Sequence, residues 1–282
     1  MSKTIGVVGS GIMGCGIAQV AALAGYEVFL FDMKEDSLKK AEETINKYLG
    51  KDVLKNRITD EDKNHTISLI NYTTDINKLK NAYFIIEAVT EKLEVKEKVF
   101  SQLHEICHPD TYFATNTSGI SITSIAGLID RADKFIGMHF FNPVPVMSLV
   151  EITRGYQTSD ETLEAARKLV LDFKKESIFV EDSPLFVVNR ILIPMISEAI
   201  FVLSEGIATK EDIDKGMLLG AKHPIGPLKL ADVIGLDTLL LVQETLLNDT
   251  QDSKYRPPHL LKKMVSAGLL GRKSGEGFYK YN

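Results

Sequence analysis

Residues 7–19 read VVGSGIMGCGIAQ, in which Gly9, Gly11 and Gly14 are spaced as G-x-G-x-x-G. The strand-like run TIGVVG leads into this stretch. The alanine-rich run GIAQVAALAG leaves it and ends at Gly25, a residue type that commonly terminates a helix. A second strand-like run, YEVFLFD, follows at once. A strand, a helix and a strand of these lengths predict a βαβ unit, and therefore a mostly parallel sheet with helices on both faces.

Each glycine of this loop has a physical reason in a dinucleotide-binding, Rossmann-type domain. The first allows a tight turn, the second lets a pyrophosphate approach the backbone, and the third lets helix and strand pack closely. The N-terminus of the following helix offers free N–H groups and a partial positive charge to the phosphates. We therefore predict that the cofactor-binding loop consists of Gly9, Gly11, Ile12, Met13 and Gly14.

Asp32 ends the second strand-like run, 18 residues after Gly14. Its carboxylate can accept hydrogen bonds from both ribose hydroxyls and would repel a 2′-phosphate, which favours NAD over NADP. Lys34 is near enough in the sequence to leave NADP open. The alternative is a cluster of turn glycines followed by a surface aspartate. The strand before the loop and the helix after it favour dinucleotide binding.

The rest of the chain divides into two parts of different character. Further strands are predicted at AYFIIEAV, TYFATNTS, KFIGMHFF and SLVEITRG, and helices at residues 36–49, 95–106 and 160–173. After Pro184 the pattern becomes helical throughout. We predict an α/β domain over residues 1–184 and a smaller all-helical domain over residues 185–282.

The helical part is rich in apolar residues for its length of about 100 residues. Its predicted helices are NRILIPMISEAIFVLSEGIA, kinked by Pro194, then TKEDIDKGMLLGA, DVIGLDTLLLVQETLLND and HLLKKMVSAGLL. One alternative is that these helices merely pack on one another and on the first domain. Their apolar content favours an additional subunit interface, so we predict a homodimer or a higher homo-oligomer.

Composition excludes several classes of protein. The net charge of −5 lacks the basic excess of a typical nucleic-acid binder. Two cysteines, Cys15 and Cys107, are far apart and match neither a disulfide framework nor a zinc site, so no metal is predicted. No apolar run approaches the roughly 20 residues that span a bilayer, which argues against a membrane protein. A strand-like run so close to the N-terminus leaves no room for a signal peptide, and we expect a cytoplasmic protein.

The stretch GMHFFNPVPVMSLVE, residues 137–151, is mostly apolar but contains His139 and Glu151. A buried charge is costly unless it is paired. The two residues lie on two predicted strands joined by the NPVPV turn, so adjacent antiparallel strands would bring them together. Histidine is suited to take the hydroxyl proton in a dehydrogenase, and a carboxylate can fix its tautomer. The alternatives are a satisfied core histidine and a glutamate on the solvent face.

Two further polar residues are candidates for contact with a substrate. Ser118 lies in NTSGISIT, at the carboxyl end of a predicted strand, where open α/β sheets bind ligands. Its hydroxyl can donate to a carbonyl or alkoxide oxygen, or it can cap a helix. Asn189 begins the first helix of the second domain and can cap that helix or extend its amide into a cleft.

Taken together, these residues resemble the short-chain L-3-hydroxyacyl-CoA dehydrogenase family, and within it the bacterial 3-hydroxybutyryl-CoA dehydrogenases. The resemblance covers essentially the whole chain. It is carried by VVGSGIMGCGIAQ, IIEAVTEKLEVK, NTSGISIT, GMHFFNPVPVMSLVEI, FVVNRILIPMISEAI, ATKEDIDKGMLLGAKHPIGPLKLADVIGLD and GRKSGEGFYKY. It implies an acyl-CoA substrate, acetoacetyl-CoA or 3-hydroxybutyryl-CoA, which composition and periodicity do not indicate.

The resemblance also implies residue roles. His139 would be the general base in oxidation and the acid in reduction, with Glu151 orienting it. Ser118 and Asn189 would hold the C3 oxygen of the substrate. The positions that would line the cofactor site, besides Ser118, are Glu91, Lys96, Asn116, Asn142 and Lys273. Lys51 and Lys55, four apart on a predicted helix, would meet the CoA phosphates, although by themselves they look like an ordinary solvated face.

One position departs from the family pattern. The family usually has Pro-Gly-Phe before Val-Asn-Arg, whereas this chain has Pro184-Leu185-Phe186. A glycine there can serve a backbone with positive φ or the close approach of a ligand. Leu185 would then cost strain or narrow the channel for the acyl or pantetheine group.

Two other functions compete with this prediction. An enzyme of a neighbouring family, such as an L-gulonate 3-dehydrogenase, would share the dinucleotide-binding fold and the His-Glu pair but act on a small free acid. Lys51 and Lys55 argue against it, because a free acid needs no distal phosphate site. A binding protein without turnover, as in some crystallins and redox-sensing repressors, is disfavoured because His139, Glu151, Ser118 and Asn189 are all present.

Overall fold

The computed structural model describes residues 4–281, and the chain divides into two compact units between Phe186 and Val187. The expected boundary lay two residues earlier, at residue 184. Phe186 is buried in a hydrophobic cluster of the first unit, and Leu185 is also buried. Apolar burial therefore places both residues with the first unit.

The first unit is built on one eight-stranded sheet with the order β3-β2-β1-β4-β5-β6-β7-β8. The strands are β1 (Thr4–Val8), β2 (Glu27–Phe31), β3 (Ile70–Thr73), β4 (Phe84–Glu87), β5 (Tyr112–Thr115), β6 (Phe135–Phe140), β7 (Leu149–Arg154) and β8 (Glu176–Glu181). Every neighbouring pair is parallel except β6 and β7. The first six strands have the order of a doubly wound dinucleotide-binding sheet, so the predicted fold class is confirmed.

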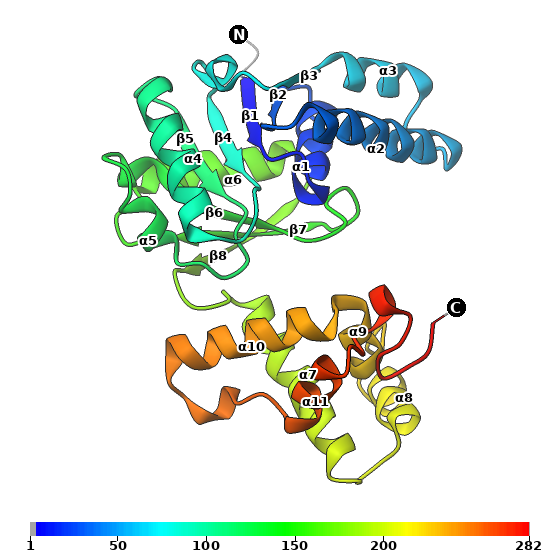
Figure 1. Cartoon of the computed structure of the whole chain (residues 1–282). Coiled ribbons are helices and arrows are strands. Elements are labelled where there is room, and N and C mark those ends of the chain that lie inside the picture. The colour runs from blue at the N-terminus through cyan, green and yellow to red at the C-terminus, as the bar shows by residue number, and fades with distance from the viewer. Residues whose placement is uncertain (1–3, 282) are drawn as a thin grey trace. The chain divides into compact units, whose positions relative to one another are not determined.

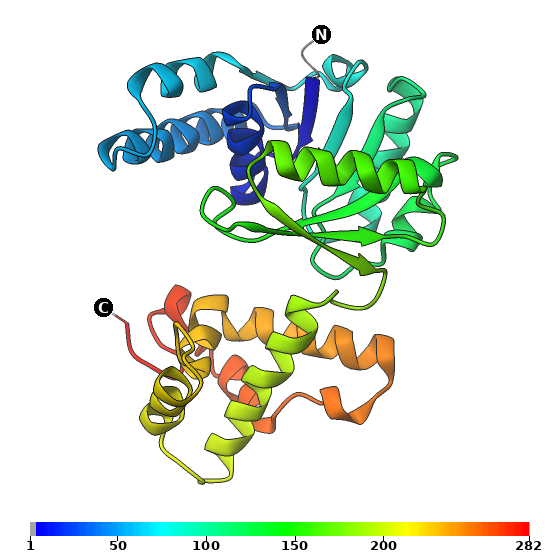
Figure 2. The same cartoon turned by 180° about the vertical axis from the view of Figure 1, so that it is seen from behind.

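Helices cover both faces of this sheet (Figures 1 and 2). On one face, α1 (Ile12–Leu23), α2 (Glu35–Leu54) and α6 (Asp160–Asp172) bury apolar side chains against the strands. On the other face lie α4 (Leu93–Ile106) and α5 (Ile122–Ala126). The strands β1, β4, β5 and β6 at the centre of the sheet are buried on both sides, which explains their almost continuous apolar sequences.

Besides short 3₁₀ turns, four elements of the first unit were not predicted from the sequence: α3, α5, β3 and β8. The helix α3 (Asp60–Ser68) begins at Thr59, whose hydroxyl and the Asp62 carboxylate form a capping box. The strand β3 is a short edge strand without an apolar run. The strand β8 contains the short apolar run Ile178, Phe179 and Val180, although most of its side chains face solvent. Short turns of 3₁₀ helix occur at η1 (Ile76–Leu79) and η2 (Ala132–Lys134).

The second unit is helical, as predicted. It contains α7 (Val188–Ser204), α8 (Lys210–Gly220), α9 (Pro227–Ile234), α10 (Leu236–Thr250) and α11 (His259–Ser266), with 3₁₀ turns η3 (Ser253–Tyr255) and η4 (Arg272–Ser274). Its core joins apolar residues of α7, α9, α10 and α11. The stretch expected to form one helix over 232–249 is instead two, because Gly235 has φ 97° and separates α9 from α10.

Buried aspartates attach the C-terminal block GRKSGEGFYKY to the helices of this unit. Asp232 accepts hydrogen bonds from the backbone N–H groups of Phe278 and Tyr279, both at 2.9 Å, and from the Tyr281 hydroxyl at 3.0 Å. Burial and this hydrogen bond raise the pKa of Tyr281 to about 12. A Cβ at Gly277 would lie 2.0 Å from an Asp232 oxygen, so the glycine permits this contact.

Candidate active site

The glycine loop has the geometry that each glycine was expected to provide. Gly9 has φ 101°, and a Cβ there would lie 2.7 Å from the carbonyl oxygen of Ala88. A Cβ at Gly14 would lie 1.7 Å from the carbonyl oxygen of Gly9, so only glycine fits beneath the turn. A Cβ at Gly11 would meet nothing within 4 Å. Gly11 is the N-cap of α1, whose first N–H groups have no partner within the helix.

The loop and Asp32 line the same cavity, which has a volume of about 720 Å³. One Asp32 oxygen accepts from the Ser10 backbone N–H at 3.0 Å and the Ser10 hydroxyl at 2.7 Å. The other accepts from the Lys34 N–H at 3.0 Å. The carboxylate is thereby held at the end of β2 beside the loop. Lys34, Ser37 and Lys40 also line this cavity. Its size, its open glycine and the Asp32 carboxylate beside the loop fit a dinucleotide.

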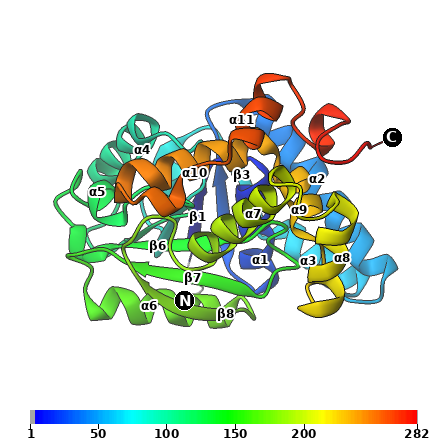
Figure 3. The ribbon, with the colours of Figure 1, turned by 90° about the horizontal axis from the view of Figure 1, so that it is seen from below.

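His139 and Glu151 face each other across the antiparallel strands β6 and β7, which run side by side in Figure 3. His139 Nδ1 lies 2.7 Å from Glu151 Oε2. The histidine is 6% exposed and the glutamate 0%. Because a carboxylate can only accept, the proton of a neutral imidazole belongs on Nδ1, which leaves Nε2 free to take a proton. The pair can therefore serve as an acid/base centre.

Aromatic rings and one amide hold the histidine in place. The rings of Phe141 and Phe186 lie 4.5 Å and 5.7 Å from the imidazole, measured between centroids. Asn116, at the end of β5, accepts a hydrogen bond from the backbone N–H of Phe140 at 2.9 Å. Asn116 thus ties the ends of β5 and β6 together next to His139. Phe186 was not predicted, because its role depends on a contact between distant parts of the chain.

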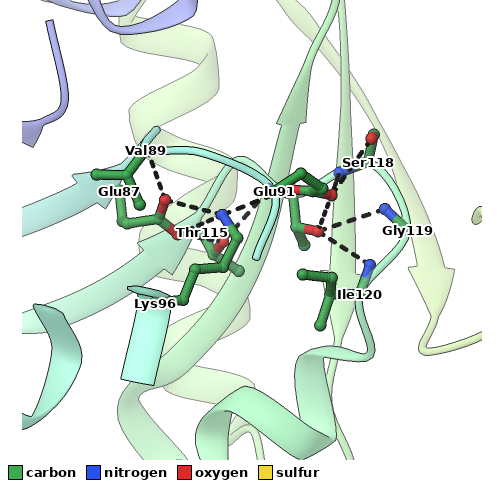
Figure 4. A network of polar contacts seen from close by, with 9 residues as sticks. Glu87, Val89, Glu91, Lys96, Thr115, Ser118, Gly119 and Ile120 are labelled. Atoms are coloured by element: carbon green, nitrogen blue, oxygen red, sulfur yellow. Dashed lines mark hydrogen bonds and ion pairs between the residues drawn. The ribbon is translucent and has the colours of Figure 1, made fainter. Parts of the chain in front are cut away.

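Ser118 lies just after β5 and contacts Glu91 (Figure 4). Glu91 Oε1 accepts from the Ser118 backbone N–H at 2.8 Å, with the Ser118 hydroxyl at 3.3 Å. Lys96 forms an ion pair with Glu91 and is almost fully buried. The helix α5 begins at Ile122 and is capped by Ser121, so the alternative that Ser118 caps a helix is wrong.

The segment that joins His139 to Glu151 is held by a residue that sequence reasoning missed. Lys175 is buried, and its ammonium donates to the backbone oxygens of Val144 and Met147, both at 2.6 Å. Burial lowers the pKa of this lysine. The same segment begins with Asn142, which precedes a cis proline. The sequence did not indicate that Lys175 is buried, because most lysines next to a strand are solvated.

The remaining predicted residues lie elsewhere in their units. Lys51 is in the last turn of α2, Lys55 caps that helix, and both side chains are exposed. In the second unit, Asn189 is the second residue of α7, whose N-cap is Val187, so the alternative of Asn189 as an N-cap is wrong. Lys273, in η4, forms an ion pair with Asp237.

A doubly wound sheet with a glycine loop, an acidic residue after β2 and a buried His-Glu pair defines a dinucleotide-dependent oxidoreductase. Comparison with known proteins makes the class specific. Residues 4–183 match the family model for the 3-hydroxyacyl-CoA dehydrogenase, NAD binding domain, and residues 186–281 match that for the 3-hydroxyacyl-CoA dehydrogenase, C-terminal domain. The chain therefore belongs to the 3-hydroxyacyl-CoA dehydrogenase family, as its resemblance predicted, and NAD is its cofactor.

Individual relatives cover nearly the whole chain. A 3-hydroxybutyryl-CoA dehydrogenase of Bradyrhizobium diazoefficiens is 49% identical over 99% of this chain and 95% of its own length. The human mitochondrial hydroxyacyl-coenzyme A dehydrogenase is 41% identical over 99% of this chain and 91% of its own length. The crystal structure of an (S)-3-hydroxybutyryl-CoA dehydrogenase from Ralstonia eutropha has a TM-score of 0.98 and 48% identity, covering 100% of both chains. Across residues 4–281, no helix is long and apolar enough to cross a membrane.

Proposed function

We propose that this protein catalyses the reversible oxidation of (S)-3-hydroxybutyryl-CoA to acetoacetyl-CoA, with NAD as hydride acceptor. The observation that carries the proposal is the buried His139–Glu151 pair on β6 and β7. Relatives that are 46–49% identical are named for activity on 3-hydroxybutyryl-CoA, or probable activity on it, which supports the choice of this substrate.

In the oxidative direction, His139 Nε2 takes the proton of the C3 hydroxyl while C3 loses a hydride and becomes a carbonyl carbon. NAD, when bound, supplies the nicotinamide ring that accepts this hydride. The imidazole then carries a positive charge, which the Glu151 carboxylate stabilises at a hydrogen-bond distance of 2.7 Å. In the reductive direction, the imidazolium returns the proton to the C3 oxygen.

Ser118 and Asn189 are assigned to the C3 oxygen of the substrate. A hydroxyl and an amide can both donate hydrogen bonds to an oxygen on which negative charge develops. The backbone N–H of Ser118 donates a hydrogen bond to Glu91, which fixes the position of Ser118. The contact between the Ser118 hydroxyl and Glu91 is long, at 3.3 Å. We assign Glu91, Lys96, Asn116, Asn142 and Lys273 to the surroundings of the cofactor, and Lys51 and Lys55 to the phosphates of CoA.

The test is a comparison of substrates and cofactors with the purified protein. The decrease in NADH absorbance is followed with acetoacetyl-CoA, and again with free acetoacetate and with NADPH. Fast turnover with the thioester and NADH alone is expected. Equal rates with free acetoacetate would instead favour an enzyme that acts on small acids. NADH binding without turnover of any acyl-CoA would favour a binding protein.

We further propose a cytoplasmic homo-oligomer, at least a dimer, that uses the helical unit as its interface. Its helices leave large apolar side chains exposed, among them Leu219 and Leu241. Light scattering of the purified protein tests this assembly. A monomeric mass at micromolar concentration would contradict it.

A further inference from the structure

The half-buried carboxylate of Asp182, just after β8, accepts hydrogen bonds from three groups at the start of α5. Its Oδ1 accepts from the backbone N–H of Ile122 at 3.0 Å. Its Oδ2 accepts from the Ser121 hydroxyl at 2.7 Å and from the backbone N–H of Thr123 at 2.8 Å. One carboxylate therefore joins the end of β8 to a segment that lies 60 residues earlier in the chain.

The helix α5 depends on this carboxylate because it is too short to order itself. It has 5 residues, and an isolated helix shorter than about 12 residues is marginal in water. Its first N–H groups have no partner within the helix. Ser121 accepts from one of them, the N–H of Ser124, and Asp182 accepts from those of Ile122 and Thr123. Asp182 therefore fixes the place at which the chain enters α5.

The turn between β5 and α5 carries Ser118 and is held at both of its ends. At the first end, Glu91 accepts from the Thr117 hydroxyl and from the Ser118 backbone N–H (Figure 4). The Thr117 hydroxyl oxygen in turn accepts from the next two backbone N–H groups after Ser118. At the second end, Asp182 holds the first residues of α5. The position of Ser118 is thus set by contacts before it and after it.

The same contacts tie this turn to the surroundings of His139. Ile122, whose N–H donates to Asp182, is fully buried, and its Cδ1 would lie 2.7 Å from a Cβ at Gly137. Gly137 is on β6, two residues before His139. In the other direction, the chain runs from Asp182 to Phe186, whose ring lies 5.7 Å from the imidazole between centroids. Asp182 therefore joins two segments that both pack beside the histidine or its strand.

We propose that Asp182 is a positioning residue, which holds the turn between β5 and α5 so that Ser118 and His139 reach the same C3 oxygen of the substrate. This assignment rests on the proposed function, in which both side chains contact that oxygen. A donor and a proton acceptor that act on one atom must be placed together, so a small shift of the turn slows the reaction. The role is indirect, because both carboxylate oxygens of Asp182 accept from residues 121–123.

The first test is Asp182→Asn, which keeps the shape of the side chain and one oxygen acceptor. The amide nitrogen that replaces the other oxygen cannot accept from α5, so the turn should loosen at this end. We expect kcat for acetoacetyl-CoA at saturating NADH to fall by about tenfold, because a displacement of about 1 Å can cost roughly 100-fold. Glu181→Gln, at the exposed neighbouring position, is the matched control and should retain wild-type kcat. If Asp182→Asn folds and keeps the wild-type kcat, the proposal is wrong.

A second variant covers the case in which Asp182→Asn does not fold. Ser121→Ala removes one donor to Asp182 and leaves the two backbone contacts in place. It is expected to fold and to lower kcat, by less than Asp182→Asn. A folded Ser121→Ala with wild-type kcat, together with an unfolded Asp182→Asn, would reduce Asp182 to a structural role and overturn the proposal.

A double-mutant cycle distinguishes positioning from a merely structural role. In a Ser118→Ala background, Asp182→Asn should cause little further loss of kcat, because the hydroxyl that Asp182 positions is gone. Losses that multiply independently would contradict the proposal. The unfolding temperature should fall equally in both backgrounds, so the dependence on Ser118 is confined to kcat.

The proposed function can fail separately. If wild-type protein does not reduce acetoacetyl-CoA, the assigned substrate is wrong. A crystal structure of the Asp182→Asn variant then tests the positioning itself. The expected result is a turn over residues 117–121 that is displaced relative to His139, and a turn in its wild-type place would overturn the proposal.

Discussion

His139 and Glu151 are cross-strand partners in the register of β6 and β7, and Nδ1 of the histidine is 2.7 Å from Oε2 of the glutamate. These are the only neighbouring strands in the sheet, as described for residues 4–281, that run antiparallel. Antiparallel pairing brings residues twelve positions apart to the same place, whereas a parallel connection requires a long crossover. The pair therefore depends on the reversal of chain direction at this point in the sheet.

Replacement of His139 by glutamine should remove the acid/base group while keeping a polar side chain of similar size. We expect kcat to fall by about 10²–10⁴-fold, the usual contribution of a general base. NADH binding, measured by fluorescence titration, should stay near the wild-type value. His65→Gln, at an exposed position on α3, is the control. An unchanged kcat in His139→Gln would remove the histidine from the mechanism.

Replacement of Asp32 by alanine should weaken discrimination between NADH and NADPH. The carboxylate lies beside the glycine loop and would repel a 2′-phosphate, while Lys34 and Lys40 line the same cavity. The ratio of kcat/KM for the two cofactors is the measurement, with Asp36→Ala on the exposed side of α2 as the control. A ratio that does not change would show that Asp32 does not contact the ribose.

The double variant Lys51→Ala/Lys55→Ala should raise KM for acetoacetyl-CoA far more than for a truncated thioester. Both side chains are exposed at the end of α2, where an ammonium can meet a phosphate. Added salt should reduce the difference between wild type and variant, because exposed charges are screened. Lys39→Ala, near the other end of α2, is the control. Equal effects on both thioesters would place these lysines away from the CoA phosphates.

Leu185 stands where the family usually has glycine, and its backbone conformation and burial predict the effect of restoring the glycine. Its φ of 61° is in the left-handed region, and its side chain is 3% exposed. A Cβ at Gly119 would lie 2.8 Å from Leu185 Cδ2, so the leucine covers the residue after Ser118. The positive φ costs about 1–2 kcal/mol. Removing a buried leucine costs about 2–5 kcal/mol.

Leu185→Gly should therefore lower the free energy of unfolding by about 2 kcal/mol, since the burial that is lost exceeds the strain that is relieved. Denaturant unfolding is the measurement. We also expect the variant to accept longer acyl-CoA chains relative to the four-carbon substrate, since it opens space beside Gly119. A variant more stable than wild type would mean that backbone strain dominates at this position.

Both cysteine thiols should be inert in the folded protein. Burial raises the pKa of Cys15 and of Cys107 from 9.0 to about 11. At pH 8 this leaves roughly 100-fold less thiolate than in the unfolded chain, and thiolate is the reactive form. Ellman's reagent should react slowly until denaturant is added. Rapid reaction of the native protein would contradict this assignment.

The same shift predicts an alkaline limit to stability. The folded pKa values lie above the unfolded ones, so the unfolded chain binds fewer protons than the folded chain above pH 9. The contribution of these thiols to the free energy of unfolding has its full value below about pH 9 and is lost as the pH rises through about 11. Replacing Cys107 by alanine should make the decrease in unfolding free energy between these values shallower.

Much of the fold followed from local sequence pattern. The glycine spacing, the apolar runs of β1 and β2, and the change to helical periodicity after Pro184 predicted a dinucleotide-binding sheet followed by a helical unit. The edge strand β3 was missed because INYT has no strong apolar run. The strand β8 was missed although it contains Ile178, Phe179 and Val180, because a run of three apolar residues is too short to indicate a strand by itself. The helix expected over 232–249 was wrong because Gly235, which is tolerated in a helical pattern, takes a positive φ.

The candidate site divides in the same way. The sequence by itself predicted the glycine loop, Asp32, His139, Glu151 and Ser118 as candidate site residues, because each lies in a stretch whose residue types and spacing have a local physical reason. Only the tertiary structure decided that Lys96 is buried between Glu87 and Glu91, that Lys175 holds the segment after β6, and that Leu185 covers Gly119. These are contacts between segments far apart in the chain or burials against the usual preference of a charged residue. No periodicity encodes such contacts, because they arise only when the strands and helices are packed together.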